Sequence, residues 1–129
     1  MGSGEYRGVL LAESLELDAV IEVPLAVDRI SRAAVGDADA GQPLVWTAVE
    51  FRVDSERVDE LADSLSRALK CEGGWYCDFH SDSEVVVVFH DRVFRYRPGD
   101  RAAREEAERY ATNMGVPQSQ LDWSDATAD

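Results

Sequence analysis

The chain has 129 residues, 45% of them apolar and 30% charged, and a formal net charge of −13. This length is close to that of one domain, and the apolar content is enough to form one core. The charge excludes non-specific binding to double-stranded nucleic acid, which is itself a polyanion. No apolar run approaches the roughly 18 residues of a membrane-spanning helix. We therefore expect a single α+β domain over residues 1–129, with no membrane partner.

The opening residues MGSGEYRG contain no basic segment followed by an apolar one, so we expect no signal peptide and a cytoplasmic location. Arginine greatly outnumbers lysine, of which Lys70 is the single example, and Asn and Ile are scarce. This bias is typical of a GC-rich microbial genome. It carries no information about function.

The first half of the chain predicts mostly extended structure. Residues 6–15 indicate a strand, and residues 20–30 indicate an interrupted one, because Pro24 has no N–H to donate and belongs at a sheet edge or a bulge. The Gly, Asp and Pro content of residues 35–43 predicts a mobile loop. Residues 45–53 alternate in character, which is typical of a half-buried strand.

A first helix is predicted after Asp54 or Ser55, either of which can cap its start. Its apolar stripe at helical spacing consists of Val58, Leu61, Ala62, Leu65 and Leu69. The pair Gly73 and Gly74 is placed to end it.

A second helix is predicted from Asp100, a good capping residue, to Gly115. Its apolar side is formed by Ala103, Ala107, Tyr110, Ala111 and Met114. The tail over residues 117–129 is polar except for Leu121 and Trp123. We expect these two side chains to pin the tail to the body and the last residues to be loose.

The stretch between the two helices predicts a three-stranded meander with turns at residues 81–84 and 90–93. With Asp82 and Ser83 at the tip of the first turn, His80 should lie opposite Val85 and Cys77 opposite Val88. A two-residue second turn at Asp91–Arg92 places Val87, Phe89, Phe94 and Tyr96 on one face. The order of strands, helix, strands and helix predicts an α+β fold, with a mostly antiparallel sheet and two helices packed on one face as a two-layer sandwich. This order resembles that of ferredoxin-like sandwiches. The resemblance concerns architecture alone and implies no functional residue.

Both cysteines and both histidines lie within residues 71–90, with the spacing Cys-x5-Cys-x2-His-x9-His. This spacing fits no common zinc-ligand pattern, and Cys77 and His80 should point to opposite faces of a strand. We therefore expect no metal site and no cofactor, and we expect Cys71 and Cys77 to be free thiols. No G-x-S-x-G motif accompanies Asp78, His80 and the neighbouring serines.

The run VVVVF at residues 85–89 is apolar without alternation, which indicates burial on both faces. If both helices cover one face, the other needs the N-terminal strands or a second copy of the chain. Exposed apolar patches of this extent usually mark an interface, and isologous dimers are the commonest arrangement. The sequence therefore predicts a homodimer through the sheet face.

The function that these features favour is a non-catalytic module that binds a protein or a small ligand. The candidate ligand-binding residues are Trp75, Tyr76, His80, His90, Tyr96 and Arg97. One alternative is a small enzyme that uses Asp78, His80 or His90 in a cleft lined by Trp75, Tyr76 and Tyr96. A further alternative is an acidic partner of a basic protein.

Overall fold

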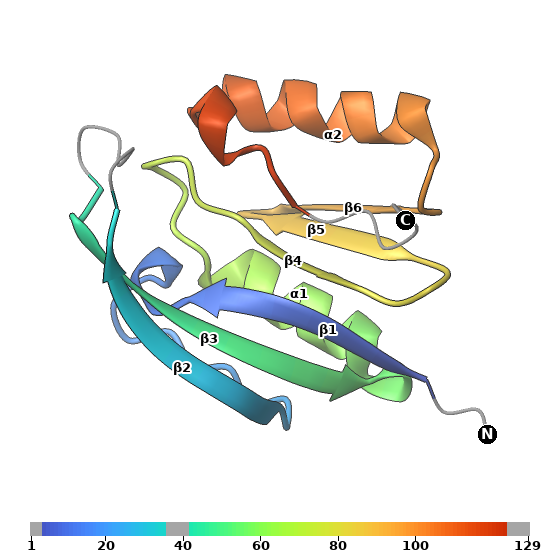
Figure 1. Cartoon of the computed structure of the whole chain (residues 1–129), viewed down its shortest axis with the longest axis horizontal. Helices are drawn as coiled ribbons and strands as arrows, with labels where there is room; N and C mark the ends of the chain where they lie inside the picture. The colour runs from blue at the N-terminus through green and yellow to red at the C-terminus, as the bar shows by residue number, and fades with distance from the viewer. Residues whose placement is uncertain (1–3, 36–41, 124–129) are drawn as a thin grey trace.

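The computed structural model describes residues 4–35 and 42–123. It contains one six-stranded antiparallel sheet with the strand order β2-β3-β1-β4-β5-β6 (Figure 1). The strands are β1 (Glu5–Leu11), β2 (Ala26–Ala34), β3 (Val45–Asp54), β4 (Cys77–His80), β5 (Val85–Phe89) and β6 (Arg92–Tyr96). The helices are α1 (Val58–Ala68) and α2 (Arg101–Asn113), with short 3-10 turns at Ala12–Ser14, Ser55–Arg57 and Gln118–Gln120. The predicted α+β class and the antiparallel sheet are confirmed.

The two helices cover opposite faces of the sheet, so the expectation that they share one face is wrong. Figure 1 shows α2 on one side of β5 and α1 on the other. The side chains of β5 give the reason, because neighbouring residues on a strand point to opposite faces. Val86 and Val88 belong to the core under α1, whereas Val85, Val87 and Phe89 belong to the core under α2.

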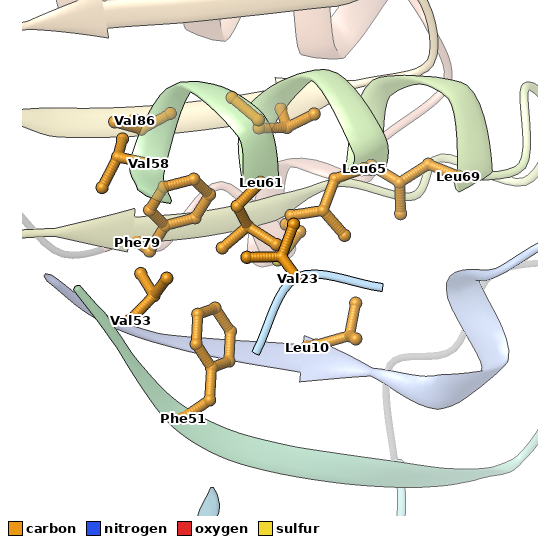
Figure 2. Packing of buried hydrophobic residues seen from close by; sticks show 13 residues of the cluster. Leu10, Val23, Phe51, Val53, Val58, Leu61, Leu65, Leu69, Phe79 and Val86 are labelled. Carbon is orange, nitrogen blue, oxygen red and sulfur yellow. The ribbon is translucent and has the colours of Figure 1, made fainter. Parts of the chain in front are cut away.

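The core under α1 is the larger of the two and joins that helix to β1, β3, β4 and β5 (Figure 2). Leu61 and Leu65 of α1 are 0% and 1% exposed. Burial of a leucine side chain stabilises a fold by roughly 1.5–3 kcal/mol, so this stripe fixes the helix on the sheet. Facing it are Leu10, Phe51, Val53, Phe79 and Val86, with Val23 closing one side.

The core under α2 is smaller and covers only the β5–β6 end of the sheet. Ala107 and Ala111 of α2 are fully buried against it, and their small side chains let the helix approach closely. Asp100 caps α2, since its carboxylate accepts a hydrogen bond from the backbone N–H of Ala103 at 3.1 Å. Gly115, with a φ of 96°, follows its end. The predicted cap and the predicted end of this helix are confirmed.

This arrangement removes the reason for predicting a homodimer through the sheet face. All five residues from Val85 to Phe89 are 0% exposed within one chain. Because α1 and α2 each cover one face of β5, no second copy is needed there. The premise that one face lies bare is wrong.

The meander has the predicted faces, although its second turn lies one residue earlier than expected. His80 pairs with Val85 and Cys77 with Val88, as predicted. Phe89 pairs with Arg92, so the turn is His90–Asp91 rather than Asp91–Arg92. This change moves the pairing by two residues, and a shift by an even number leaves Val87, Phe89, Phe94 and Tyr96 on the one face predicted for them.

Three other boundaries differ from the predictions. The strand expected over residues 6–15 ends at Leu11, and the strand expected over residues 20–30 begins only after Pro24. Most of the loop expected over residues 35–43 lies outside the described residues. Helix α1 ends well before Gly73, because Leu69 leaves the helix to form a bridge with Leu15. Within the described part of the chain, no helix has the length and apolar character to span a membrane.

Candidate functional site

A hollow of about 590 Å³ lies on the same face of the sheet as α2, over the strands that α2 leaves uncovered. Its floor is formed by β1, β3 and β4, and its wall by the tail after α2, which returns to the sheet in red in Figure 1. Small-molecule sites typically have volumes of roughly 300–1,000 Å³. The side chains that line it include Arg7, Val9, Trp46, Glu50, Trp75, Tyr76, Asp78, His80, Asp122 and Trp123.

Strand pairing arranges the floor in two rows that run across the sheet. Val9 of β1 lies between Glu50 of β3 and Asp78 of β4 in one row. In the next row Arg7 lies between Arg52 and His80. Partners that lie opposite each other on antiparallel strands have Cβ atoms about 5 Å apart. An exposed apolar residue, Val9, is thus flanked by two carboxylates.

Hydrogen bonds hold the tail as a wall of the hollow. The hydroxyl of Tyr76 donates to the carbonyl of Gln120 at 2.5 Å. The indole Nε1 of Trp123 donates to the hydroxyl of Tyr96 at 2.8 Å. The guanidinium of Arg104 donates to the carbonyl of Trp123 at 3.0 Å and lies 4.7 Å from the centre of its ring. The wall is therefore tied both to the sheet and to α2.

A buried amide contact fixes the same wall from the other side. The side-chain amide of Gln120 donates to the side-chain carbonyl of Gln42 at 3.2 Å, and both residues are buried. Gln42 also donates to the carbonyl of Gly73 at 2.6 Å. A buried amide that is hydrogen-bonded specifies position, because leaving it unsatisfied costs about 1–3 kcal/mol.

Aromatic rings form two contacting pairs around the hollow. Trp46 and Trp75 have ring centres 5.3 Å apart, and so do Tyr76 and Trp123, which meet edge to face. Trp75 and Trp123 are buried, whereas Trp46 and Tyr76 are partly exposed. The partly exposed rings give the hollow aromatic surface of its own.

The charged groups at the hollow influence one another. A hydrogen bond from Arg52 lowers the pKa of Asp28 at the rim, and the charge of Arg7 lowers it further. Burial raises the pKa of the Tyr76 hydroxyl well above its usual value, with the charges of Asp78 and Asp122 adding to the effect. This hydroxyl therefore stays protonated and serves as a donor.

The structure brings together three of the six candidate ligand-binding residues. Trp75, Tyr76 and His80 line the hollow. His90 lies in the β5–β6 turn, where its Nδ1 atom is 3.0 Å from the carbonyl oxygen of Leu69 and its Nε2 atom is 3.2 Å from a carboxylate oxygen of Asp91.

The remaining two candidates also lie outside the hollow. Tyr96 is buried under α2 and contacts the wall through Trp123. Arg97 is exposed after the end of β6. Within the cleft proposed for the enzyme, Asp78 and His80 come together, but His90 and Tyr96 do not join them.

Sequence reasoning missed the residues that the N-terminal strands and the tail contribute. Arg7, Trp46 and Glu50 come from β1 and β3, and Asp122 and Trp123 come from the tail. One signal was present, since Trp46 and Glu50 fall on the same predicted face of their strand. The sequence contains no comparable signal for the pairing of β1 with β4.

The sulfur and imidazole groups are separated by the sheet. The thiol of Cys77 lies in the core under α1, 3.5 Å from the carbonyl oxygen of Val9, and burial raises its pKa. His80 lines the opposite face, as parity predicted. Cys71 is exposed, and both cysteines are free thiols. Among residues 4–35 and 42–123, no three His, Cys, Asp or Glu side chains are grouped as metal ligands.

Comparison of the chain with protein-family models, with curated proteins and with solved structures gives no match. The hollow and the side chains around it are therefore the features that indicate a function.

Proposed function

We propose that this protein is a non-catalytic cytoplasmic module that binds a small molecule in the hollow between the sheet and the tail. The observation that carries the proposal is the placement of tryptophan. The chain has three tryptophans, and all three line this hollow together with Tyr76. Aromatic surface combined with a few fixed polar groups is the usual composition of a ligand site.

The wall of the hollow is held in place by hydrogen bonds, and this supports a role in ligand binding. The tail is held by hydrogen bonds to Tyr76, Tyr96 and Gln42. A site that is already formed before binding loses less conformational entropy when a ligand enters. The cytoplasmic part of the proposal is supported by the two free thiols, one of them exposed.

A fragment screen by two-dimensional amide NMR tests this function. Fragments should shift the amides of β1, β4 and residues 118–123 together. Val9→Trp should abolish these shifts, because Val9 is 41% exposed on the floor and a larger ring fills the space. Val27→Trp is the matched control, since Val27 is 51% exposed on the edge strand outside the hollow. Binding that survives Val9→Trp would place the ligand elsewhere and contradict the proposal.

A second candidate is self-association through the free edge of β2. This strand is nine residues long, lies at the end of the sheet and is exposed over most of its length, including Val27 and Ile30. Long edge strands offer unpaired backbone groups to another chain. Pairing of β2 with β2 of a second copy makes an isologous contact.

Light scattering over a range of protein concentrations tests this contact. We expect a dimer that Ile30→Asp weakens and Leu17→Asp does not, because Leu17 is 88% exposed but lies outside β2. A monomer at all concentrations would refute self-association and leave ligand binding untouched.

A further inference from the structure

The residues that line the hollow carry an excess of negative charge. They include one arginine, Arg7, against four carboxylates, which are Asp28, Glu50, Asp78 and Asp122. Arg29 and Arg52 reach two of these carboxylates from outside, and Arg52 also contacts Glu5. Among the residues that the structure describes, three cations then face five carboxylates. The net charge of −13 on the whole chain adds to the local field.

Two of the three arginines near the hollow, Arg7 and Arg52, are directed to one end of it. The third, Arg29, is largely exposed and lies 3.8 Å from Glu50. Arg52 donates to both carboxylate oxygens of Asp28 at 2.9–3.0 Å. Arg7 acts on the same carboxylate, since its charge lowers the pKa of Asp28. The positive charges in the row of Arg7 and Arg52 are therefore balanced by Asp28 and Glu5 at the rim. Among the described residues that line the hollow, Arg7 is then the one arginine that an anionic ligand could meet, against four carboxylates.

The other row has the features that an organic cation needs. Glu50 and Asp78 flank Val9, so carboxylates lie on both sides of an exposed apolar floor. Asp122 approaches from the wall, where its carboxylate lies 3.3 Å from the hydroxyl of Tyr76. A carboxylate that accepts a hydrogen bond from an ammonium group forms the stronger, charge-assisted kind.

The rings complete the same recognition pattern. Trp46 and Tyr76 are partly exposed at the hollow, and a cation within about 6 Å of such a ring is attracted to its face. A contact of this kind already exists within the protein, where the guanidinium of Arg104 lies 4.7 Å from the centre of the Trp123 ring. Aromatic faces together with carboxylates select positive charge on an apolar body.

We propose that the ligand of this hollow is a small organic cation, an amine or quaternary ammonium compound with an apolar body. The proposal rests on the proposed function, because it assigns a ligand class to the same hollow. The ammonium group lies between Glu50, Asp78 and Asp122, and the apolar body lies on Val9 and against Trp46.

Calorimetric titration with three probes of one shape tests the assignment. The probes are phenethylammonium, 2-phenylethanol and 3-phenylpropanoate, which differ mainly in the charge of the end group. We expect phenethylammonium to bind at least tenfold tighter than the alcohol and the carboxylate not to bind. The preference should decrease with added salt, because salt screens partly exposed charges.

Two variants test whether carboxylates of the hollow bind the ammonium group. Asp78→Asn and Asp122→Asn should each weaken phenethylammonium binding about tenfold, because each removes one charge-assisted contact. Glu106→Gln is the matched control, since it changes the net charge equally on the exposed surface of α2, and we expect a change below twofold. Asp122 lies in the tail after α2, so its variant tests the inference even if Asp78→Asn perturbs β4.

The outcomes separate this inference from the proposed function. Binding of the alcohol or the carboxylate as tightly as the amine would overturn the cation assignment, while shifts of the amides lining the hollow would still support a ligand site. Equal effects of Asp78→Asn and Glu106→Gln would also overturn it. Absence of binding by all three probes contradicts the cation assignment, and the fragment screen with Val9→Trp then decides the proposed function independently.

Discussion

The indole Nε1 of Trp123 donates a hydrogen bond to the hydroxyl of Tyr96 at 2.8 Å, and this contact joins the tail to β6 beneath α2. It lies between two residues that are 4% and 7% exposed. One buried contact thus helps to complete the core under α2 and to position the wall of the hollow. Stability and binding are coupled at this point.

Trp123→Ala should lower the free energy of unfolding by about 3 kcal/mol, because it leaves a cavity and removes the ring that Tyr76 contacts. Tyr96→Phe removes the hydroxyl and keeps the ring, and should cost about 1–2 kcal/mol. Urea denaturation measures both changes. Equal costs for the two variants would contradict the packing role of Trp123.

Gly8→Ala should destabilise the pairing of β1 with β4. A Cβ atom at Gly8 would lie 2.4 Å from the backbone oxygen of Asp78 and 2.6 Å from the Cβ atom of Phe79. Backbone cannot move away as cheaply as a flexible side chain, so we expect a loss of about 2–3 kcal/mol in urea denaturation. Gly4→Ala is the control, since no atom lies within 4 Å of its added Cβ. A loss of equal size at Gly4 would show that the crowding at Gly8 is irrelevant.

Val86→Ala and Val87→Ala should each cost about 2–3 kcal/mol, although the two side chains point to opposite faces. The reason is that α1 and α2 of the same chain bury both residues completely. Urea denaturation at two protein concentrations measures the costs. Ile30→Asp is included in both variants to weaken pairing through β2. In this background, a midpoint for Val87→Ala that rises with protein concentration would show that a second chain, and not α2, covers this face.

The stability of the protein should depend on the ionisation of Glu84. Burial of this carboxyl opposes ionisation, but hydrogen bonds from Arg95 at 2.9 Å and from Tyr6 at 2.7 Å lower its pKa below 4.5. A carboxyl with a lowered folded-state pKa stabilises the fold above the unfolded-state value. That contribution is lost as the pH falls through the folded-state pKa.

Glu84→Gln should therefore reduce the loss of unfolding free energy between pH 5 and pH 3, measured by urea denaturation at each pH. Glu106→Gln, on the exposed surface of α2, should leave the loss close to that of the unmodified protein. An unchanged pH profile for Glu84→Gln would show that the hydrogen bonds to Arg95 and Tyr6 do not stabilise the charged form.

The two thiols should react with a disulfide reagent at very different rates. Cys71 is exposed, whereas burial raises the pKa of the Cys77 thiol and hides it under α1. The thiolate is the reactive form. We expect one fast thiol in the native protein and a second only in denaturant, with the fast phase absent from Cys71→Ser. Two fast thiols in the native protein would contradict the burial of Cys77.

Local sequence patterns determined most of the secondary structure. The alternation of residues 45–53, the helical stripe from Val58 and the cap at Asp100 each depend on a few neighbouring residues. The same is true of the faces of Val85–Phe89, because parity along a strand is fixed by the backbone. Boundaries were less secure where a distant partner decides them, as when Leu15 ends α1 by pairing with Leu69.

The sequence by itself determined that β5 is buried on both faces, since its five apolar residues leave no polar side. Only the tertiary structure decided what covers it, because one chain can place α1 and α2 on opposite faces as well as on the same one. The position and lining of the hollow were likewise decided by the tertiary structure. The pairing of Arg7 with His80 and the contact of Trp123 with Tyr96 join segments far apart in the chain, and no local pattern encodes such contacts.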